Sequence, residues 1–228
     1  MRISEIFHSL QGEGILAGVP SVFVRTSGCN LRCWYCDTPY TSWAPEGVEM
    51  SVAAVAEAVL RHRTRHVVVT GGEPLLSPDL PELLARLADA GRHITVETAA
   101  TVFRPIHCDL ASLSPKLSNS APRHREGGRF LAMHEAARWR PDVIREFLKH
   151  HECQIKFVVD APSDMEEIDG MLAELPPIPA DRILLMPQGV TREELASRSV
   201  WLATLCLDRG WRFCPRLHID LYGHTRGT

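Results

Sequence analysis

Short apolar runs that alternate with amphipathic segments limit the fold of this chain more than any other feature of its sequence. The runs predict strands at residues 21–25, 67–70, 94–97, 110–114, 155–159, 183–186 and 212–218. Several are apolar nearly throughout, which is typical of strands buried on both faces of a parallel sheet. Amphipathic stripes predict helices near residues 51–60, 80–91, 141–150, 163–175 and 191–209. The alternation predicts an α/β fold with a mostly parallel sheet and right-handed crossovers.

Length and charge narrow the class of protein further. The 228 residues suit one domain, expected to span residues 1–228. The 25 basic and 28 acidic residues give a net charge of −3, which argues against an electrostatic grip on nucleic acid. The N-terminus lacks the layout of a signal peptide, and no apolar run approaches the ~20 residues that span a bilayer. We therefore expect a cytoplasmic protein with no membrane or nucleic-acid partner.

Three of the seven cysteines, Cys29, Cys33 and Cys36, lie in one loop after the first predicted strand. Three thiolates spaced in this way can hold three corners of a cubane iron–sulfur cluster and leave the fourth iron open for a cofactor or substrate. A structural zinc site would need a fourth ligand, which a histidine could supply. A redox pair at Cys33 and Cys36 would leave Cys29 without a role. The other cysteines are scattered singly and are expected to be apolar fillers.

Polar and glycine residues stand where the predicted strands end. In parallel α/β folds the chemistry gathers at the carboxyl ends of the strands. Here these ends carry Arg25, Thr70-Gly71-Gly72, Glu97, Ser114-Pro115-Lys116, Gln188 and His218. The sequence therefore predicts a site at this edge of the sheet, next to the cysteine loop.

With its cysteine spacing, the chain resembles the radical S-adenosylmethionine (SAM) superfamily. Tyr35, just before the third cysteine, and the Gly-Gly-Glu-Pro stretch at residues 71–74 fit the same pattern. The resemblance implies that this stretch binds the amino group of SAM, because glycine lets the backbone approach closely and present its carbonyl groups. It also implies a [4Fe-4S] cluster whose open iron binds SAM, which yields a 5′-deoxyadenosyl radical that removes a hydrogen atom from the substrate.

Further motifs narrow the resemblance to one family. They are Leu10–Gly14, Arg25–Gly28, Cys36-Asp37-Thr38, Glu97-Thr98, Leu113–Lys116, Arg216–Ile219 and Leu221–Gly223. Together they are similar, over essentially the whole chain, to the 7-carboxy-7-deazaguanine synthase family. The resemblance implies a partial (β/α) barrel and a lyase that converts 6-carboxy-5,6,7,8-tetrahydropterin to 7-carboxy-7-deazaguanine with loss of ammonia, in queuosine and preQ0 biosynthesis. It further implies a homodimer, a Mg²⁺ ion and an electron donor such as flavodoxin.

The resemblance also assigns roles to individual residues, with no catalytic residue beyond the cofactor-held radical. Those expected to hold the cluster are Cys29, Cys33 and Cys36, and Thr38 is expected to contact Mg²⁺ with Asp37 in support. Those expected to bind SAM are Tyr35, Cys36, Asp37, Gly72, Glu73, Ser114, Pro115, Lys116 and Gln188. Those expected to bind the substrate are Leu10, Gln11, Gly12, Glu13, Arg25, Thr70, Glu97 and His218.

The side chains suit these roles, and each also has a plainer interpretation. Arg25 offers a planar, bidentate partner for the substrate carboxylate, unless it pairs with an acidic neighbour. Glu13 and Glu97 can accept from the N–H edge of the pterin, or they can be solvated surface acids. The hydroxyl of Thr38 suits a hard Mg²⁺ ion that keeps waters, or it can cap a loop. His218 can contact substrate or lie on the surface.

The sequence departs from the family pattern in two places, and two alternative functions remain open. Ala99 and Ala100 stand where many family members carry an amide residue and a glycine, which puts details of substrate contact in question. Trp34 and Tyr35 place two aromatic rings next to the cysteines, where we expect them to shield the cluster and pack near adenine. A glycyl-radical activating enzyme shares the cysteine spacing but acts on a protein backbone. A non-catalytic metal-binding module would not need SAM.

Overall fold

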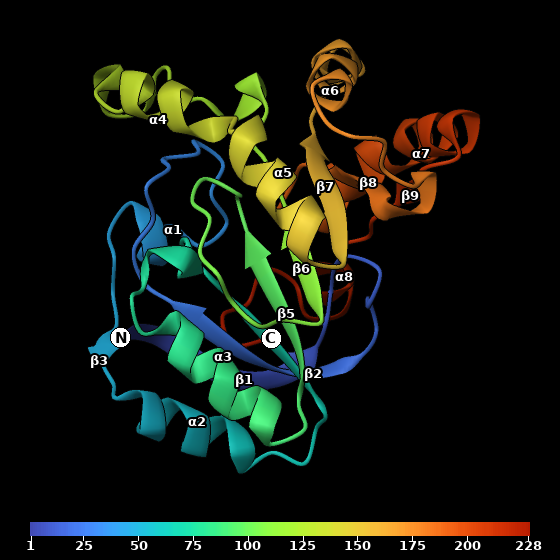
Figure 1. The fold of residues 1–228 in the computed structure, drawn as a ribbon. Coiled ribbons are helices and arrows are strands. Elements are labelled where there is room, and N and C mark those ends of the chain that lie inside the picture. The colour runs from blue at the N-terminus through green and yellow to red at the C-terminus, as the bar shows by residue number, and fades with distance from the viewer.

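The predicted strands and helices form one curved, open sheet with helices packed outside it, and the computed structural model describes all 228 residues (Figure 1). The strands are β1 (Arg2–Leu10), β2 (Pro20–Thr26), β3 (Val48–Glu49), β4 (His66–Gly71), β5 (His93–Thr98), β6 (Leu110–Leu113), β7 (Cys153–Val159), β8 (Ile183–Pro187) and β9 (Arg212–Phe213). The helices are α1 (Pro39–Ser42), α2 (Val52–Leu60), α3 (Leu80–Asp89), α4 (Leu131–Arg138), α5 (Pro141–His150), α6 (Asp164–Ala173), α7 (Arg192–Arg209) and α8 (Leu217–Tyr222).

The sheet confirms the expected mostly parallel α/β architecture. Its strand order is β3-β1-β2-β4-β5-β6-β7-β8-β9, and it does not close. Every neighbouring pair from β2 to β9 is parallel, whereas β1 runs antiparallel to both β2 and β3. Because each crossover moves one position in the same direction, the carboxyl ends of the parallel strands follow one another along a single edge.

Apolar strands and capped helices account for most of this arrangement. Val67 and Val69 are fully buried and Val68 nearly so, as expected for a strand covered on both faces. The predicted cap at Ser51 is present, since its side chain accepts from the backbone N–H of Ala54 at 3.2 Å. None of the helices combines the length and apolar character needed to span a lipid bilayer.

The prediction of a strand at residues 212–218 is wrong in its extent. The strand β9 ends at Phe213, and residues 217–222 form helix α8 instead. Pro215 has no N–H to donate to a ladder, so the strand stops just before it. Sequence patterns also missed β1, α1 and α4. The strand β1 is mostly half-buried and therefore lacks an apolar run.

Candidate active site

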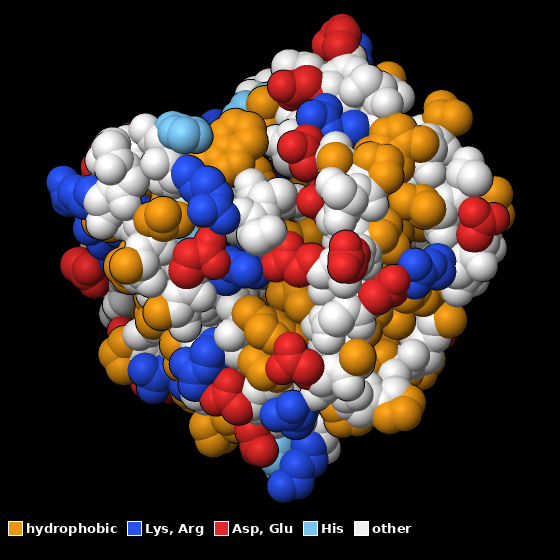
Figure 2. Space-filling view, turned by 90° about the horizontal axis from the view of Figure 1, so that it is seen from above, with side chains coloured by type: hydrophobic (Ala, Val, Ile, Leu, Met, Phe, Trp, Pro, Cys, Tyr) orange, Lys and Arg blue, Asp and Glu red, His pale blue; other side chains and the backbone are white.

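A cavity of about 410 Å³ opens at the carboxyl ends of the parallel strands. Register brings these ends together, since Arg25 of β2 lies opposite Thr70 of β4. The predicted residues that line the cavity are Leu10, Gln11, Gly12, Glu13, Arg25, Cys29, Cys33, Tyr35, Cys36, Asp37, Thr38, Thr70, Gly72, Glu97, Ser114, Lys116, Gln188 and His218. Seen from above, acidic and basic side chains gather around the middle of the molecule (Figure 2).

The cysteine loop brings all three predicted cluster ligands to this cavity. Donors already face two of the sulfurs, since Leu31 N–H lies 3.3 Å from Cys29 Sγ and Ser42 Oγ lies 3.2 Å from Cys36 Sγ. Burial raises the pKa of Cys33 to about 12, so a metal would have to displace the proton of this thiol in order to bind it. No three His, Cys, Asp or Glu side chains gather around one metal position, as zinc would require. Three separate thiolates would instead suit a cubane iron–sulfur cluster.

Glycine is required where the turn after β4 packs against the cysteine loop. A Cβ at Gly72 would lie 2.0 Å from the carbonyl oxygen of Gly28 and 2.9 Å from that of Thr41. The next residue, Glu73, donates its N–H to the same Gly28 carbonyl at 2.8 Å. The backbone of the Gly-Gly turn therefore lies directly against the residue that precedes Cys29, the first of the three cysteines.

Replacing Gly72 with alanine is expected to displace the cysteine loop, because backbone atoms cannot move aside as a side chain can. We expect a loss of roughly 3 kcal/mol in stability and a lower iron content after reconstitution. Gly170→Ala in α6 is the matched control, since its Cβ would meet no atom within 4 Å. That control should be stabilising by roughly 0.5–1 kcal/mol. Normal iron content in Gly72→Ala would contradict the close packing.

Glu73 and Pro115 were both predicted to bind SAM, but neither lines the cavity. The Glu73 carboxylate accepts from Thr98 Oγ1 at 2.8 Å and from Ala99 N–H at 2.9 Å. Burial raises its pKa to about 6. The side chain thus fastens the turn after β4 to the end of β5. Ala100, which follows Ala99, has a φ of 55°, a left-handed conformation that glycine adopts more readily.

Four buried or half-buried charges connect the loop after β1 to the cysteine loop. Lys156 of β7 and Arg216 both pair with Glu13, with Arg216 Nε 3.1 Å from Glu13 Oε1, and Arg216 also pairs with Asp37. Burial alone would raise the pKa of Glu13, but the two cations hold it well below its usual range. Glu13 and Asp37 are therefore ionised, and Arg216 fixes their relative positions.

The two groups predicted to bind opposite sides of the substrate keep part of their hydrogen-bonding capacity. Arg25 does pair with an acidic neighbour, since its Nε donates to Glu5 Oε1 at 2.6 Å. Its two terminal nitrogens donate to no protein acceptor, so that end of the guanidinium can still take a carboxylate. Glu97 accepts from Gln11 Nε2 at 3.0 Å through Oε1, which leaves Oε2 without a protein donor.

His218 packs on the backbone of the loop after β1. A Cβ at Gly12 would lie 1.9 Å from His218 Nδ1, so glycine at this position makes room for the ring. Burial lowers the pKa of His218, although Glu13 acts in the opposite direction, and the imidazole is neutral near pH 7. The ring reaches the cavity from α8, although His218 was predicted to end a strand.

The cysteine loop is also held from outside the cavity by His134 of α4. Its Nδ1 accepts from Arg32 N–H at 3.2 Å, and its Nε2 lies 2.8 Å from Ser120 Oγ. Ser120 Oγ in turn donates to the carbonyl of Leu117 at 2.6 Å. This chain requires a neutral ring with its proton on Nε2, and burial lowers the pKa of His134 to about 4.

The stability that His134 provides is expected to be lost in acid. The unfolded chain takes up the proton near pH 6.5, so the contribution is complete above that value and falls as the pH drops towards 4. The loss by pH 5 is about 2 kcal/mol, which lowers Tm by about 5 °C. Thermal unfolding at pH 7.5 and 5 should therefore show a smaller acid shift in His134→Gln than in the unaltered protein. Equal shifts would contradict this role.

Sequence reasoning missed several residues that line the cavity. Lys156 and Arg216 are the most important of them, and the segment from His224 to Thr228 lines the cavity as well. Lys156 carries a detectable signal, because it is the single charge within the apolar strand β7. The segment at 224–228 carries none, since its position depends on how the chain turns after α8.

Comparisons with known proteins identify the family to which the chain belongs. A model of the radical SAM superfamily matches residues 23–114, which include the three cysteines and the Gly-Gly turn. The fold, the cysteine loop and this match define a radical SAM enzyme. Two relatives are named 7-carboxy-7-deazaguanine synthase. The one from Rhodopirellula baltica is 45% identical, and the match covers 100% of this chain and 89% of the relative. The one from Halobacterium salinarum is 48% identical, and the match covers 100% of this chain and 93% of the relative. The chain therefore belongs to the 7-carboxy-7-deazaguanine synthase family.

A solved structure supports the same assignment. The crystal structure of QueE from Escherichia coli is 25% identical and has a TM-score of 0.68, with 93% of this chain and 92% of that chain covered. The expected family and fold class are thus confirmed, and neither a glycyl-radical activating enzyme nor a metal-binding module without catalysis fits the full-length relatives.

Proposed function

We propose that the chain, acting as one domain, converts 6-carboxy-5,6,7,8-tetrahydropterin to 7-carboxy-7-deazaguanine with loss of ammonia, as a step of 7-deazapurine biosynthesis. One observation carries the proposal: the three cysteines, Arg25 and Glu97 line a single cavity. A [4Fe-4S] cluster with SAM would supply the radical that abstracts hydrogen, and the protein supplies position and a sheltered space. Cys29, Cys33 and Cys36 would hold the cluster.

Arg25 and Glu97 are proposed to orient the pterin. The free terminal nitrogens of Arg25 suit the substrate carboxylate, and the free oxygen of Glu97 suits an N–H donor of the ring. Glu13 was expected to accept from the substrate as well. Its two oxygens already face Lys156 and Arg216, so we propose that it mainly holds the loop that carries Gln11 in place.

The SAM side of the cavity is proposed to comprise Tyr35, Asp37, Gly72, Ser114, Lys116 and Gln188, with the carbonyls of the Gly-Gly turn facing the amino group. Lys116 Nζ donates to Ser114 Oγ at 2.8 Å, which joins two of these residues. Thr38 Oγ1 lies 3.5 Å from Asp37 Oδ1, so two hard oxygens are available near the cysteines. We propose that they contact a Mg²⁺ ion held otherwise by substrate and water.

A direct assay tests the proposal. The reconstituted protein is incubated without oxygen with 6-carboxy-5,6,7,8-tetrahydropterin, SAM, Mg²⁺ and a chemical reductant, and the product is identified by mass. Formation of 7-carboxy-7-deazaguanine with recovery of SAM is the expected result. A fully reduced sample that consumes no pterin would overturn the proposed function. The Mg²⁺ ion is tested separately by measuring product formation by Thr38→Ala at increasing Mg²⁺ concentrations. Only the dependence of product formation on Mg²⁺ should change in this variant.

A further inference from the structure

The cysteine loop has one side that lines the cavity and another that faces away from it. Cys33 and Tyr35 line the cavity, whereas Trp34, which lies between them in sequence, does not. Trp34 is instead 47% exposed. A large aromatic ring next to a predicted cluster ligand is therefore partly exposed to solvent and lies outside the cavity.

This outer side is connected rigidly to the backbone that carries the ligands. Arg125 Nη1 donates to the carbonyl of Trp34 at 3.0 Å, and Trp34 Nε1 donates to the carbonyl of Asn119 at 2.7 Å. Trp43 Nε1 donates to the carbonyl of Cys33 at 2.9 Å, and the Arg125 guanidinium lies 3.9 Å from the centre of the Trp43 ring. A protein that touched this surface would lie against the cluster loop itself.

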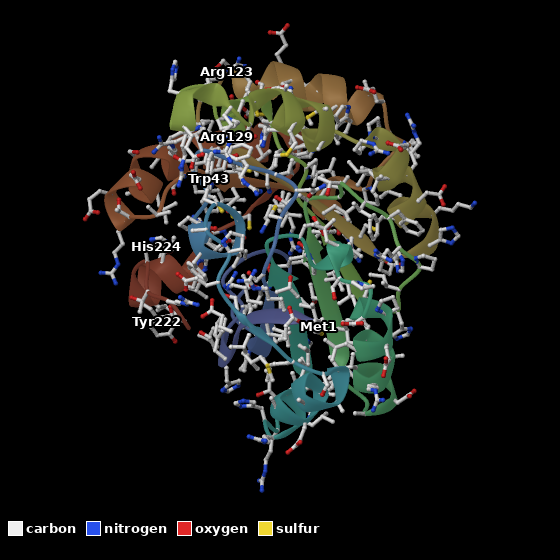
Figure 3. All side chains as sticks on the ribbon, turned by 90° about the vertical axis from the view of Figure 1, so that its left-hand side faces the viewer. Met1, Trp43, Arg123, Arg129, Tyr222 and His224 are labelled. Carbon is white, nitrogen blue, oxygen red and sulfur yellow. The ribbon has the colours of Figure 1, made fainter.

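Aromatic rings and arginines alternate across this part of the molecule. We call it the arginine–aromatic surface, formed by Trp34, Trp43, Arg123, Arg125, Arg129 and Phe130. Arg129 lies 4.4 Å from the centre of the Phe130 ring, and the Trp43 and Phe130 rings meet edge to face at 5.7 Å. Trp43, Arg123 and Arg129 face the same side of the molecule in Figure 3.

The arginines of this surface outweigh its acids. Arg129 lies 3.7 Å from Glu126, and Arg123 lies 3.9 Å from Glu135. Glu135 is already paired with Arg138 at 2.7 Å, and Arg125 has no acidic partner. The chain as a whole carries more acids than bases, with a net charge of −3. A positive surface beside the cysteine loop is therefore a local feature and not the average of the molecule.

We infer that the arginine–aromatic surface is the docking site of a small acidic one-electron carrier protein that reduces the cluster. The inference rests on the proposed function only in that the enzyme needs an electron for each radical it forms. The carrier is oxidised by one electron and the cluster is reduced by one electron, and no bond forms or breaks. Opposite charges speed the encounter, while exposed aromatic and arginine side chains are the types that anchor protein interfaces.

The test compares charge reversal on this surface with charge reversal elsewhere. Arg123→Glu with Arg129→Glu changes two side chains that are 57% and 70% exposed, so folding should be unaffected. Arg61→Glu with Arg86→Glu is the matched control, because both are exposed, each pairs with a glutamate, and α2 and α3 lie away from α4 in Figure 1. The probe is purified acidic flavodoxin, and its Kd is measured at low and moderate salt.

We expect the Arg123→Glu/Arg129→Glu variant to bind flavodoxin at least about tenfold more weakly at low salt and with a smaller salt dependence. Cluster bleaching by reduced flavodoxin should slow in proportion, while bleaching by a small uncharged photoreductant stays unchanged. Equal binding by this variant and the unaltered protein, or an equal loss in the control, would overturn the docking site. Product formation with the chemical reductant reports separately on the proposed function.

Discussion

Replacing Cys33 with alanine is expected to remove the visible absorbance of the cluster and to lower product formation by at least about a thousandfold. Cys33 is the buried member of the three cysteines, and no cysteine outside these three lines the cavity to take its place. The measurement is the absorption spectrum and iron content after anaerobic reconstitution, followed by the product assay. Because the side chain becomes smaller by one sulfur, circular dichroism should show an unchanged fold.

Cys108→Ala is the control for this prediction. Cys108 is a free, half-buried cysteine outside the cavity, with its Sγ 3.6 Å from His151 Nδ1. Its replacement should leave the absorbance, the iron content and the turnover as they are. Cluster absorbance that persists in Cys33→Ala, or disappears in Cys108→Ala, would show that the ligands are not the three cysteines of the loop.

Arg216→Met is expected to have the largest effect on stability. The substitution keeps much of the side-chain volume but leaves Asp37 without its ionic partner and Glu13 with Lys156 alone. Removing one member of a buried ion-pair network costs about 3–5 kcal/mol, which lowers Tm by about 10 °C in a chain of this size. Since the same arginine fixes Asp37 beside the cysteines, turnover should fall as well.

Two further variants make this result interpretable. Arg61→Met breaks an exposed pair with Glu57, in which both side chains are 71% exposed, and should change stability by less than about 1 kcal/mol. Arg216→Lys keeps the charge but cannot reach Glu13 and Asp37 with separate nitrogens of a planar group, so its loss should be intermediate. A Tm for Arg216→Met within 2 °C of that of Arg61→Met would contradict a buried network, since less than about 1 kcal/mol then separates them.

The sequence predicts the central strands well for a physical reason. Strands such as β4 are covered on both faces, so burial selects an unbroken apolar run that stands out. The strand β1 is only half-buried, and its mixed composition resembles a loop. At the other end, Pro215 stops β9 after two residues and α8 follows, a change of direction that no periodicity announces.

Some features of the candidate site could likewise be predicted from the sequence and others could not. Residues at strand ends, including Arg25 and Glu97, could be predicted because parallel strands bring their carboxyl ends together. The hydrogen-bond and ion-pair partners of the charged side chains at the site could not be predicted in this way. Arg25 meets Glu5 across the antiparallel pair β1–β2, and Arg216 reaches Glu13 over a separation of 203 residues. Such pairings depend on the packing of the whole fold.

The two outermost strands of the sheet, β3 and β9, are each two residues long. An edge strand exposes backbone N–H and C=O groups that can pair with another chain, and short edges limit such pairing. The short strand β3 covers only Arg2 and Ile3 of β1, however, so the rest of β1 keeps an open edge on the side away from β2. A homodimer of this chain that shares main-chain hydrogen bonds would therefore have to form them along this part of β1. We expect association through any other face to depend on contacts between the side chains of helices and loops.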